Sequence, residues 1–138
     1  MPFRYVDEDL SKELTNENLV VSVTMTQYKS DWTSRKLFWR HVERVEKSLS
    51  ERQGLVGYSM RRQILGNRAW TMTIWKDESS LLAFVRSPAH LEAMQQALPT
   101  LENASFARVE LPASDIPLSW EKAEQLLISQ NSKSLYLD

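Results

Sequence analysis

Hydrophobic and polar residues alternate along several short stretches of the chain, and this period of two predicts β-strands. The stretch 19–28 is rich in β-branched residues and places serine and threonine between its apolar positions. The stretch 69–75 repeats the pattern, with tryptophan, methionine and isoleucine on one face and threonine on the other. Two further stretches, 55–65 and 105–111, bring the predicted strands to four. Gly66-Asn67 fits a two-residue hairpin turn between the second and third strands.

A longer period, close to 3.6 residues, indicates helices between and after these strands. Apolar residues repeat at helical spacing within 35–52 and again within 77–99. The second of these segments restarts at Ser87-Pro88, where serine can cap the helix and proline can take its first position. Ser119 precedes a last amphipathic helix.

The order of these elements is βαββαβ plus a C-terminal helix, which predicts the α+β class and a ferredoxin-like sandwich. We expect a single domain over residues 1–138. It would comprise a polar N-terminal segment (1–18), the ferredoxin-like core (19–111) and a C-terminal extension with one helix (112–138).

Both helices of this topology cover one face of the sheet, so the other face needs a cover as well. The strands 19–28 and 69–75 carry Ser and Thr on their second face, where a solvated sheet would carry Lys, Glu and Arg. We predict that this face meets the same sheet of a second copy, giving a homodimer that forms a dimeric α/β barrel. The alternative is that threonine stands there because it favours strands.

Composition narrows the possible partners. The chain has 138 residues, a net charge of -1 and no cysteine. No net field draws it to nucleic acid or to an anionic membrane, and neither is an expected partner. The missing cysteines exclude disulfides, thiolate catalysis and cysteine-based zinc sites. Residues 1–18 lack the basic start and apolar stretch of a signal peptide, so the predicted location is the cytoplasm.

Several residues in the middle of the chain resemble the antibiotic-biosynthesis-monooxygenase-like family. They are the GLVGY motif at 54–58, a strand that ends in Trp75, and an acidic-capped helix in which Ser87 follows Phe84. The resemblance spans about 19–111 and implies a small dimeric α/β-barrel protein. Members of the family include cofactor-independent oxygenases of aromatic polyketides, quinol oxygenases and haem-degrading enzymes.

The haem-degrading branch differs from this chain at the positions that matter for haem. That branch has a tryptophan in the second helix and a haem-ligating histidine ten residues later, where this chain has Phe84 and Met94. It also has an asparagine in the first strand, and the stretch 19–28 has none. Haem is therefore not expected, no metal-ligand spacing is present, and we predict that no cofactor is needed.

The two histidines are the candidate catalytic residues. An imidazole with a pKa near 6.5 can act as a base at neutral pH. His90 follows Ser87 in the first turn of a helix, and His41 lies beside the apolar stripe of the segment 35–52. The alternatives are a half-exposed helix residue for His90, and for His41 a boundary residue hydrogen-bonded to a neighbour.

Five more side chains are candidates for binding an apolar or aromatic molecule between the sheet and the helices: Trp75, Tyr58, Trp39, Phe84 and Met94. Stacking and area burial on such residues are what a flat substrate needs, although a core or a dimer interface needs them equally. The predicted function is a small-molecule monooxygenase-like protein that acts on or binds such a compound. The alternative is a non-catalytic dimeric ligand-binding or regulatory module of the same fold.

Overall fold

The computed structural model describes residues 3–130 and contains one antiparallel sheet with the strand order β1-β3-β4-β2-β5. The strands are β1 (Arg4–Tyr5), β2 (Asn18–Tyr28), β3 (Leu55–Arg62), β4 (Arg68–Trp75) and β5 (Leu101–Pro112). The helices are α1 (Glu8–Glu13), α2 (Trp32–Leu49), α3 (Glu78–Val85), α4 (Pro88–Ala97) and α5 (Trp120–Ser129), with short 3₁₀ turns at η1 (Leu98–Thr100) and η2 (Ala113–Asp115). The ferredoxin-like βαββαβ order and the C-terminal helix are thereby confirmed.

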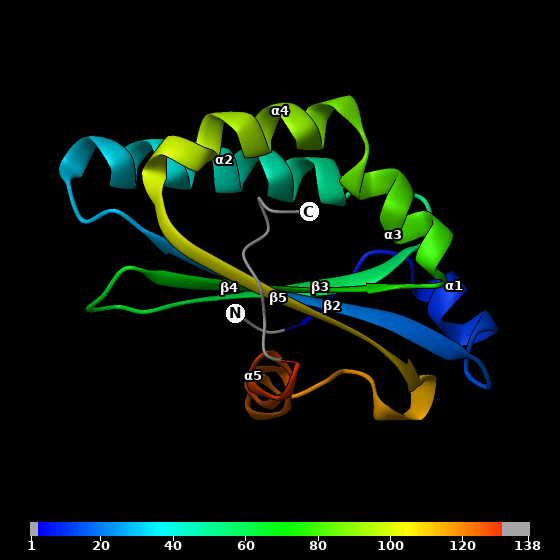
Figure 1. Ribbon diagram of the computed structural model, residues 1–138. Coiled ribbons are helices and arrows are strands. Elements are labelled where there is room, and N and C mark those ends of the chain that lie inside the picture. The colour runs from blue at the N-terminus through cyan, green and yellow to red at the C-terminus, as the bar shows by residue number, and fades with distance from the viewer. Residues whose placement is uncertain (1–2, 131–138) are drawn as a thin grey trace.

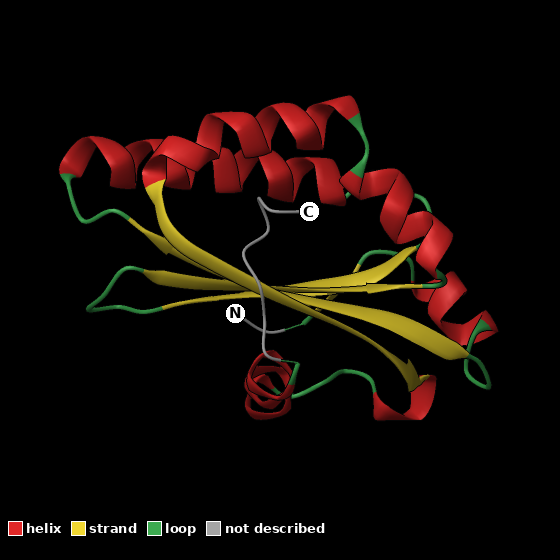
Figure 2. Ribbon diagram, in the orientation of Figure 1, coloured by secondary structure: helices red, strands yellow, loops and turns green. Residues whose placement is uncertain are grey.

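The elements form three layers, with the sheet in the middle (Figure 1). Helices α2 and α4 lie side by side over one face, and α5 lies across the other (Figure 1). The same view coloured by secondary structure shows the strands between α2 and α4 on one side and α5 on the other (Figure 2). None of the helices within residues 3–130 is both long enough and apolar enough to cross a membrane.

Side-chain caps fix where the main helices begin. Asp31, Asp77, Ser87 and Ser119 each accept a hydrogen bond from the backbone N–H three residues later. Such caps satisfy N–H groups that the first turn of a helix leaves unpaired. The restart at Ser87-Pro88 and the helix after Ser119 therefore begin where the sequence predicts.

The two faces of the sheet are exchanged relative to the sequence prediction. Strand β2 pairs with β4 so that Thr24 lies opposite Thr71, and this serine and threonine face lies beneath α2 and α4. The alternate positions, such as Val21 and Met72, belong to the core that packs against α5. The placement of the serine and threonine face at a dimer seam is therefore wrong. The sheet and the helices α2 and α4 are not packed together along their whole length, and a cavity lies between them. Polar side chains of this sheet face, such as Thr26 and Thr71, border that cavity.

The C-terminal extension covers the apolar face within one chain. Val21, Val23, Met72 and Ile74 are fully buried there, together with side chains from α5. An ion pair also ties the sheet to the helix, because Arg61 of β3 contacts Glu124 of α5. The Arg61 guanidinium lies 4.4 Å from the centre of the Trp70 ring and 5.7 Å from that of Trp120.

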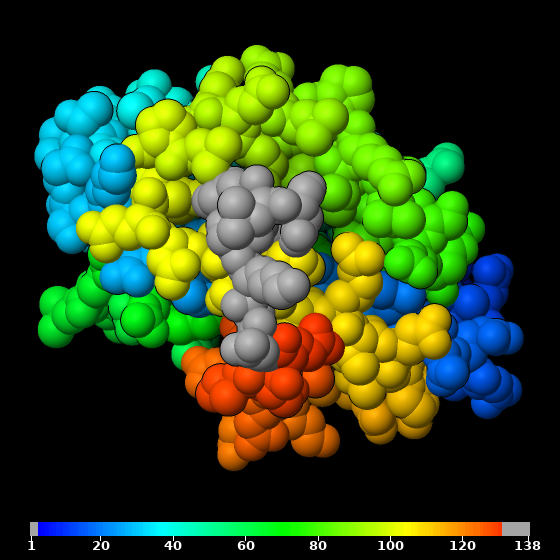
Figure 3. All heavy atoms as spheres, viewed as in Figure 1, coloured from blue at the N-terminus to red at the C-terminus, as the bar shows by residue number. Residues whose placement is uncertain are grey.

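The end of α5 is fastened to the edge strand β5. The Gln130 side chain accepts a hydrogen bond from the Arg108 N–H (3.0 Å) and donates one to the Arg108 carbonyl (2.8 Å). Figure 3 shows α5, in orange to red, packed beside the orange end of β5. The rest of the extension, residues 131–138, lies outside the described residues.

Two local predictions differ from the structure. The N-terminal segment is not merely polar, because β1 pairs with β3 (Arg4 opposite Tyr58) and α1 follows it. The predicted two-residue hairpin is a longer loop over residues 63–67, since β3 ends at Arg62. Ile64 and Leu65 in this loop are 90% and 98% exposed. An apolar pair in a loop is easily misread as the end of a strand when only hydrophobicity is considered.

Candidate functional site

A cavity of about 540 Å³ lies between the sheet and the two helices above it. This volume is in the range of pockets that enclose small organic ligands. Its helical wall comes from α2 and α4: Phe38, Trp39, His41, Val42, Glu43, Val45, Glu46, His90, Ala93, Met94 and Ala97. Its sheet wall comes from β2, β3 and β4: Thr26, Met60, Arg61, Arg62, Ala69, Trp70 and Thr71.

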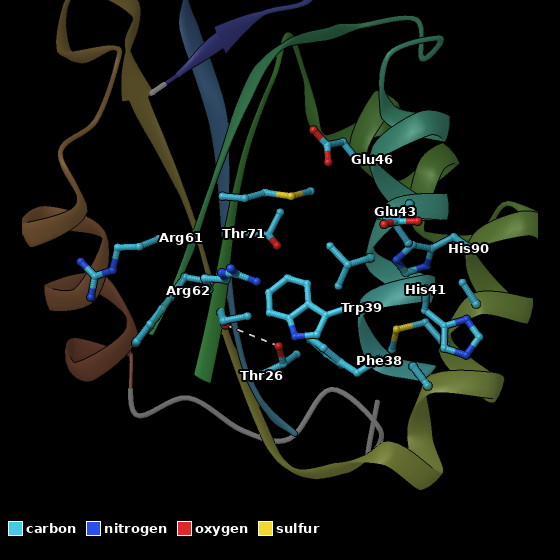
Figure 4. Close-up of a pocket in the computed structure, with 18 residues that line it drawn as sticks. Thr26, Phe38, Trp39, His41, Glu43, Glu46, Arg61, Arg62, Thr71 and His90 are labelled. Carbon is cyan, nitrogen blue, oxygen red and sulfur yellow. Dashed lines mark hydrogen bonds between the residues drawn. The ribbon is translucent and has the colours of Figure 1, made fainter. Parts of the chain in front are cut away.

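The chemical groups are divided between the two walls. Figure 4 shows the imidazoles of His41 and His90 on the helical side, and Arg62 and Thr71 on the sheet side. Arg61 also borders the cavity, but its guanidinium points away from it, toward α5 (Figure 4). Adjacent strand residues point to opposite faces, which is why only one of these two arginines faces the cavity.

His90 is held by the junction between α3 and α4. Its backbone N–H donates to the Ser87 hydroxyl (3.3 Å), and Ser87 in turn donates to the Phe84 carbonyl (2.7 Å). The imidazole Nδ1 lies 3.1 Å from the Val85 carbonyl oxygen, and the Phe84 ring packs at 4.7 Å between ring centres. A carbonyl can only accept a hydrogen bond, so Nδ1 carries the proton and Nε2 keeps a free lone pair.

The electrostatic surroundings keep this imidazole neutral. Burial lowers the pKa of His90, and the nearby Arg52 lowers it further, although the hydrogen bond to Val85 acts in the opposite direction. An imidazole whose pKa lies below the ordinary histidine value is unprotonated at pH 7 and can accept a proton from a substrate. His90 also borders a second cavity of about 150 Å³ between α2 and α4.

His41 is the less exposed of the two histidines, with 7% of its surface accessible. Burial lowers its pKa, and the neighbouring Arg44 and Arg40 add to the effect. Its Nδ1 atom is enclosed and has no hydrogen-bond partner among the described residues. The alternative that His41 is a boundary residue hydrogen-bonded to a neighbour therefore finds no support at that atom.

Trp39 and Arg62 form the part of the cavity suited to a flat molecule. The Arg62 guanidinium lies 5.2 Å from the centre of the Trp39 ring, within the distance of a cation–π contact. Trp39 is half-buried and reaches toward the sheet from α2 (Figure 4). An indole in this position offers a stacking surface.

Three of the predicted binding residues do not line the cavity. Trp75 is fully buried, donates from its indole nitrogen to the Thr73 hydroxyl (2.8 Å) and packs at 5.3 Å against Phe84. Phe84 supports the His90 ring from outside the cavity. The buried Tyr58 donates to Glu46 (3.2 Å), and burial together with Glu46 raises the pKa of its hydroxyl. These three residues support the cavity wall, whereas His90, His41, Trp39 and Met94 form it.

The sequence prediction missed the polar residues of the wall. Glu43 and Glu46 follow Trp39 at i+4 and i+7, so their position on one helical face was readable once Trp39 was placed at the cavity. Thr26 and Thr71 were assigned to the other face of the sheet. The Thr26 hydroxyl, for example, donates to the Ala69 carbonyl (3.4 Å), as the dashed line in Figure 4 marks.

The described residues contain no group of three or more histidine, aspartate or glutamate side chains placed to hold a metal ion. The chemistry that the site itself offers is acid–base chemistry by neutral imidazoles beside an aromatic surface.

Comparison with known proteins places this geometry in a family. The profile described as antibiotic biosynthesis monooxygenase matches residues 25–96, which is more than half of the chain and includes most of the cavity wall. The chain belongs to the antibiotic biosynthesis monooxygenase family. The match ends before β5 and α5, so the helix that covers the apolar face lies outside the matched region.

Solved structures share the fold of this antibiotic biosynthesis monooxygenase family member at low sequence identity. A conserved protein from Methanosarcina mazei Go1 is 17% identical, with a TM-score of 0.61 and coverage of 67% of this chain and 91% of its own. SnoaB, a cofactor-independent oxygenase from Streptomyces nogalater, is 13% identical, with a TM-score of 0.57 and coverage of 67% and 91%. A dimeric ferredoxin-like protein of unknown function from Thermobifida fusca is 10% identical, with a TM-score of 0.56 and coverage of 68% and 92%. No curated protein matched the sequence.

Proposed function

We propose that this protein is a monooxygenase-like enzyme that binds a flat, apolar or aromatic molecule in the cavity between the sheet and helices α2 and α4. The observation that carries the proposal is the position of His90, a neutral imidazole whose Nε2 lone pair is free beside an aromatic cavity wall. Membership of the antibiotic biosynthesis monooxygenase family supports the class of reaction.

The proposed reaction begins with proton abstraction from an acidic C–H group of the bound molecule. The proton passes to Nε2 of His90, and the electron pair of the C–H bond stays on the substrate as a delocalised carbanion. Trp39 binds the flat face of that anion, and Arg62, 5.2 Å from the indole centre, offsets part of its charge.

Dioxygen then reacts with the carbanion to form a C–O bond, and protonation gives a hydroperoxide. When the same carbon still carries a hydrogen, loss of water leaves a carbonyl group. One oxygen atom is in the product and the other in water, and both hydrogens of the water come from the substrate. This reaction sequence balances without a further reductant, so the proposal requires no cofactor, in line with SnoaB, which is a cofactor-independent oxygenase.

A homodimer remains part of the proposal, as do the cytoplasmic location and the absence of nucleic-acid and membrane partners. The dimeric protein from Thermobifida fusca supports the dimer. The apolar sheet face is filled by the chain's own α5, so a dimer of this protein needs a contact surface that differs from that face.

Oxygen uptake with anthrone tests the proposed function. Anthrone is flat, has an acidic CH₂ group conjugated to a carbonyl, and would give anthraquinone and water. The protein, dialysed against a chelator, is expected to accelerate oxygen uptake above the buffer rate with saturation in anthrone. Binding of anthrone without any such acceleration would contradict the oxygenase and favour the non-catalytic ligand-binding module.

A further inference from the structure

Three of the four most exposed large apolar side chains within residues 3–130 lie at one end of the molecule. Ile64 and Leu65, in the loop between β3 and β4, are 90% and 98% exposed. Trp32, the first residue of α2, is 78% exposed. The start of α2 and the loop between β3 and β4 lie at the same end of the molecule, on the left in Figures 1 and 3.

The loop that carries Ile64 and Leu65 is fastened to the end of β2. The Tyr28 N–H donates to the Asn67 carbonyl (2.9 Å), and the Asn67 side chain donates back to the Tyr28 carbonyl (2.8 Å). The Tyr28 hydroxyl also donates to the Gly66 carbonyl (3.2 Å). The fold therefore holds the two aliphatic side chains in water, where they add no packing to the core. Adjoining exposed apolar side chains of this kind mark an interaction surface.

This end of the molecule is basic, although the whole chain has a net charge of -1. Residues 29–36 and 62–68 together contain one carboxylate, Asp31, which accepts a hydrogen bond as the cap of α2. They contain five cations, all of them exposed, and none of these five forms an ion pair with another of the residues 3–130. The five cations are Lys29, Arg35, Lys36, Arg62 and Arg68.

We infer that this end of the molecule docks on the surface of an anionic lipid bilayer. Ile64 and Leu65 enter the boundary between headgroups and acyl chains, and Trp32 lies at the level of the headgroups, where indoles are enriched in membrane proteins. The cations contact lipid phosphates, and the long stems of Lys and Arg let the charges reach the headgroups while the apolar side chains insert.

Charge complementarity selects this occupant. A second copy of the same surface would bring five cations against five cations, whereas an anionic bilayer neutralises them. Two insertion residues or a few cations bind a membrane weakly when each acts alone, and the combination gives stable attachment. The expectation that no membrane is a partner follows from the net charge of the whole chain, and the local charge of this end revises it.

The docked orientation also concerns the cavity, because Arg62 borders both the cavity and the loop. That part of the cavity wall would face a bilayer, in which flat apolar compounds dissolve. Docking itself does not depend on the proposed reaction, so either proposal can fail while the other stands.

Co-sedimentation with lipid vesicles tests the docking. We expect the protein to bind vesicles of equal parts phosphatidylglycerol and phosphatidylcholine, to bind pure phosphatidylcholine far less, and to be released by about 1 M salt. The double variant Ile64→Ser/Leu65→Ser should lower the affinity for the anionic vesicles roughly tenfold or more. Ile128→Ser, which changes a side chain that is 79% exposed on α5, is the matched control and should bind as wild type.

The contribution of charge is measured in the same assay. Lys29→Gln and Arg68→Gln should each lower the affinity by about fivefold, since one cation near an anionic surface contributes about that factor. Lys12→Gln removes the same charge from α1 and should leave the affinity unchanged. Equal affinities of Lys29→Gln, Arg68→Gln and Lys12→Gln would overturn the electrostatic part of the inference.

Insertion of the loop can be followed with a single fluorescent label, because the chain has no cysteine. Leu65→Cys labelled with an environment-sensitive dye should show a blue shift on addition of the anionic vesicles, and Ile128→Cys labelled in the same way should not. No binding to these vesicles, or equal spectra for the two labelled variants, would overturn the inference. A dimer in lipid-free solution that Leu65→Ser dissociates would also overturn it, because a second copy would then cover the loop.

Discussion

The Nδ1 atom of His90 lies 3.1 Å from the carbonyl oxygen of Val85, where α3 ends and α4 begins. This contact sets the tautomer of the imidazole, and the Phe84 ring packs against it at 4.7 Å between ring centres. The sequence Ser87-Pro88-Ala89-His90 positions the residue, because a capping serine and an N-terminal proline place His90 in the first helical turn.

Replacing His90 by glutamine should remove the base while keeping a polar side chain at the cavity. Loss of a positioned general base costs typically about 100- to 10,000-fold in rate, so the oxygen uptake with anthrone should fall by that amount in kcat. Gln95→Ala, on the exposed side of the same helix, is the control and should behave as wild type. Activity retained in His90→Gln would exclude His90 as the base.

The pH dependence should report a base with a lowered pKa. Burial lowers the pKa of His90, so the neutral form persists below the ordinary value of about 6.5. The rate at low substrate should therefore be level near neutral pH and should fall only below about pH 6.5, as the imidazole becomes protonated. An acid limb centred above the ordinary histidine value would contradict this assignment.

Replacing Arg52 should shift the acid limb of the pH–rate profile. Its positive charge is one of the causes that lower the pKa of His90, so Arg52→Gln should raise that pKa and shift the acid limb to higher pH. Lys12→Gln on α1 removes the same charge elsewhere and should leave the limb in place. An unshifted limb in Arg52→Gln would show that another group limits the reaction at low pH.

Filling the cavity should weaken substrate binding without loss of the fold. Ala93 borders the cavity from α4, so Ala93→Leu places three more carbon atoms in the space that the ligand needs. We expect KM for anthrone to rise by about tenfold, since a few lost contacts and a steric clash amount to roughly 1.4 kcal/mol. Ala83→Leu, at an exposed position of α3, adds the same volume outside the cavity. Equal KM values for the two variants would place the binding site elsewhere.

Helix α5 should contribute to stability through one face only. Leu127 is 9% exposed in the core beneath the sheet, whereas its neighbour Ile128 is 79% exposed. Leu127→Ala should lower the free energy of unfolding by about 2–5 kcal/mol, and Ile128→Ala by less than about 0.5 kcal/mol. Urea unfolding followed by tryptophan fluorescence measures both values. Equal effects would mean that α5 does not pack on the sheet as described.

The regular part of the fold could be predicted because local patterns determine it. The alternation in 19–28 and 69–75, and the caps at Ser87 and Ser119, depend only on neighbouring residues and on backbone geometry. The choice of sheet face could not be made in this way. Either face of β2 could meet the helices, and the outcome depends on α5, which is far away in the sequence and covers the more apolar side.

The part of the candidate site that lies on helices could also be predicted from local patterns. His90, His41, Trp39 and Met94 lie on helices, where their direction follows from the helical period once a face is fixed. Trp75 was expected at the cavity because an aromatic side chain suits a flat, apolar substrate. It is fully buried at the end of β4 and packs against Phe84 of α3, and only the packing of α3 reveals this.

The location of ligand binding is tested most directly by NMR of the methionine methyl groups, labelled with ¹³C, during addition of anthrone under nitrogen. Met60 and Met94 border the cavity, while Met25 and Met72 belong to the core on the opposite face of the sheet. We predict saturable shifts of the Met60 and Met94 signals, with those of Met25 and Met72 unchanged. Shifts confined to Met25 and Met72, or no shifts at all, would contradict binding between the sheet and helices α2 and α4.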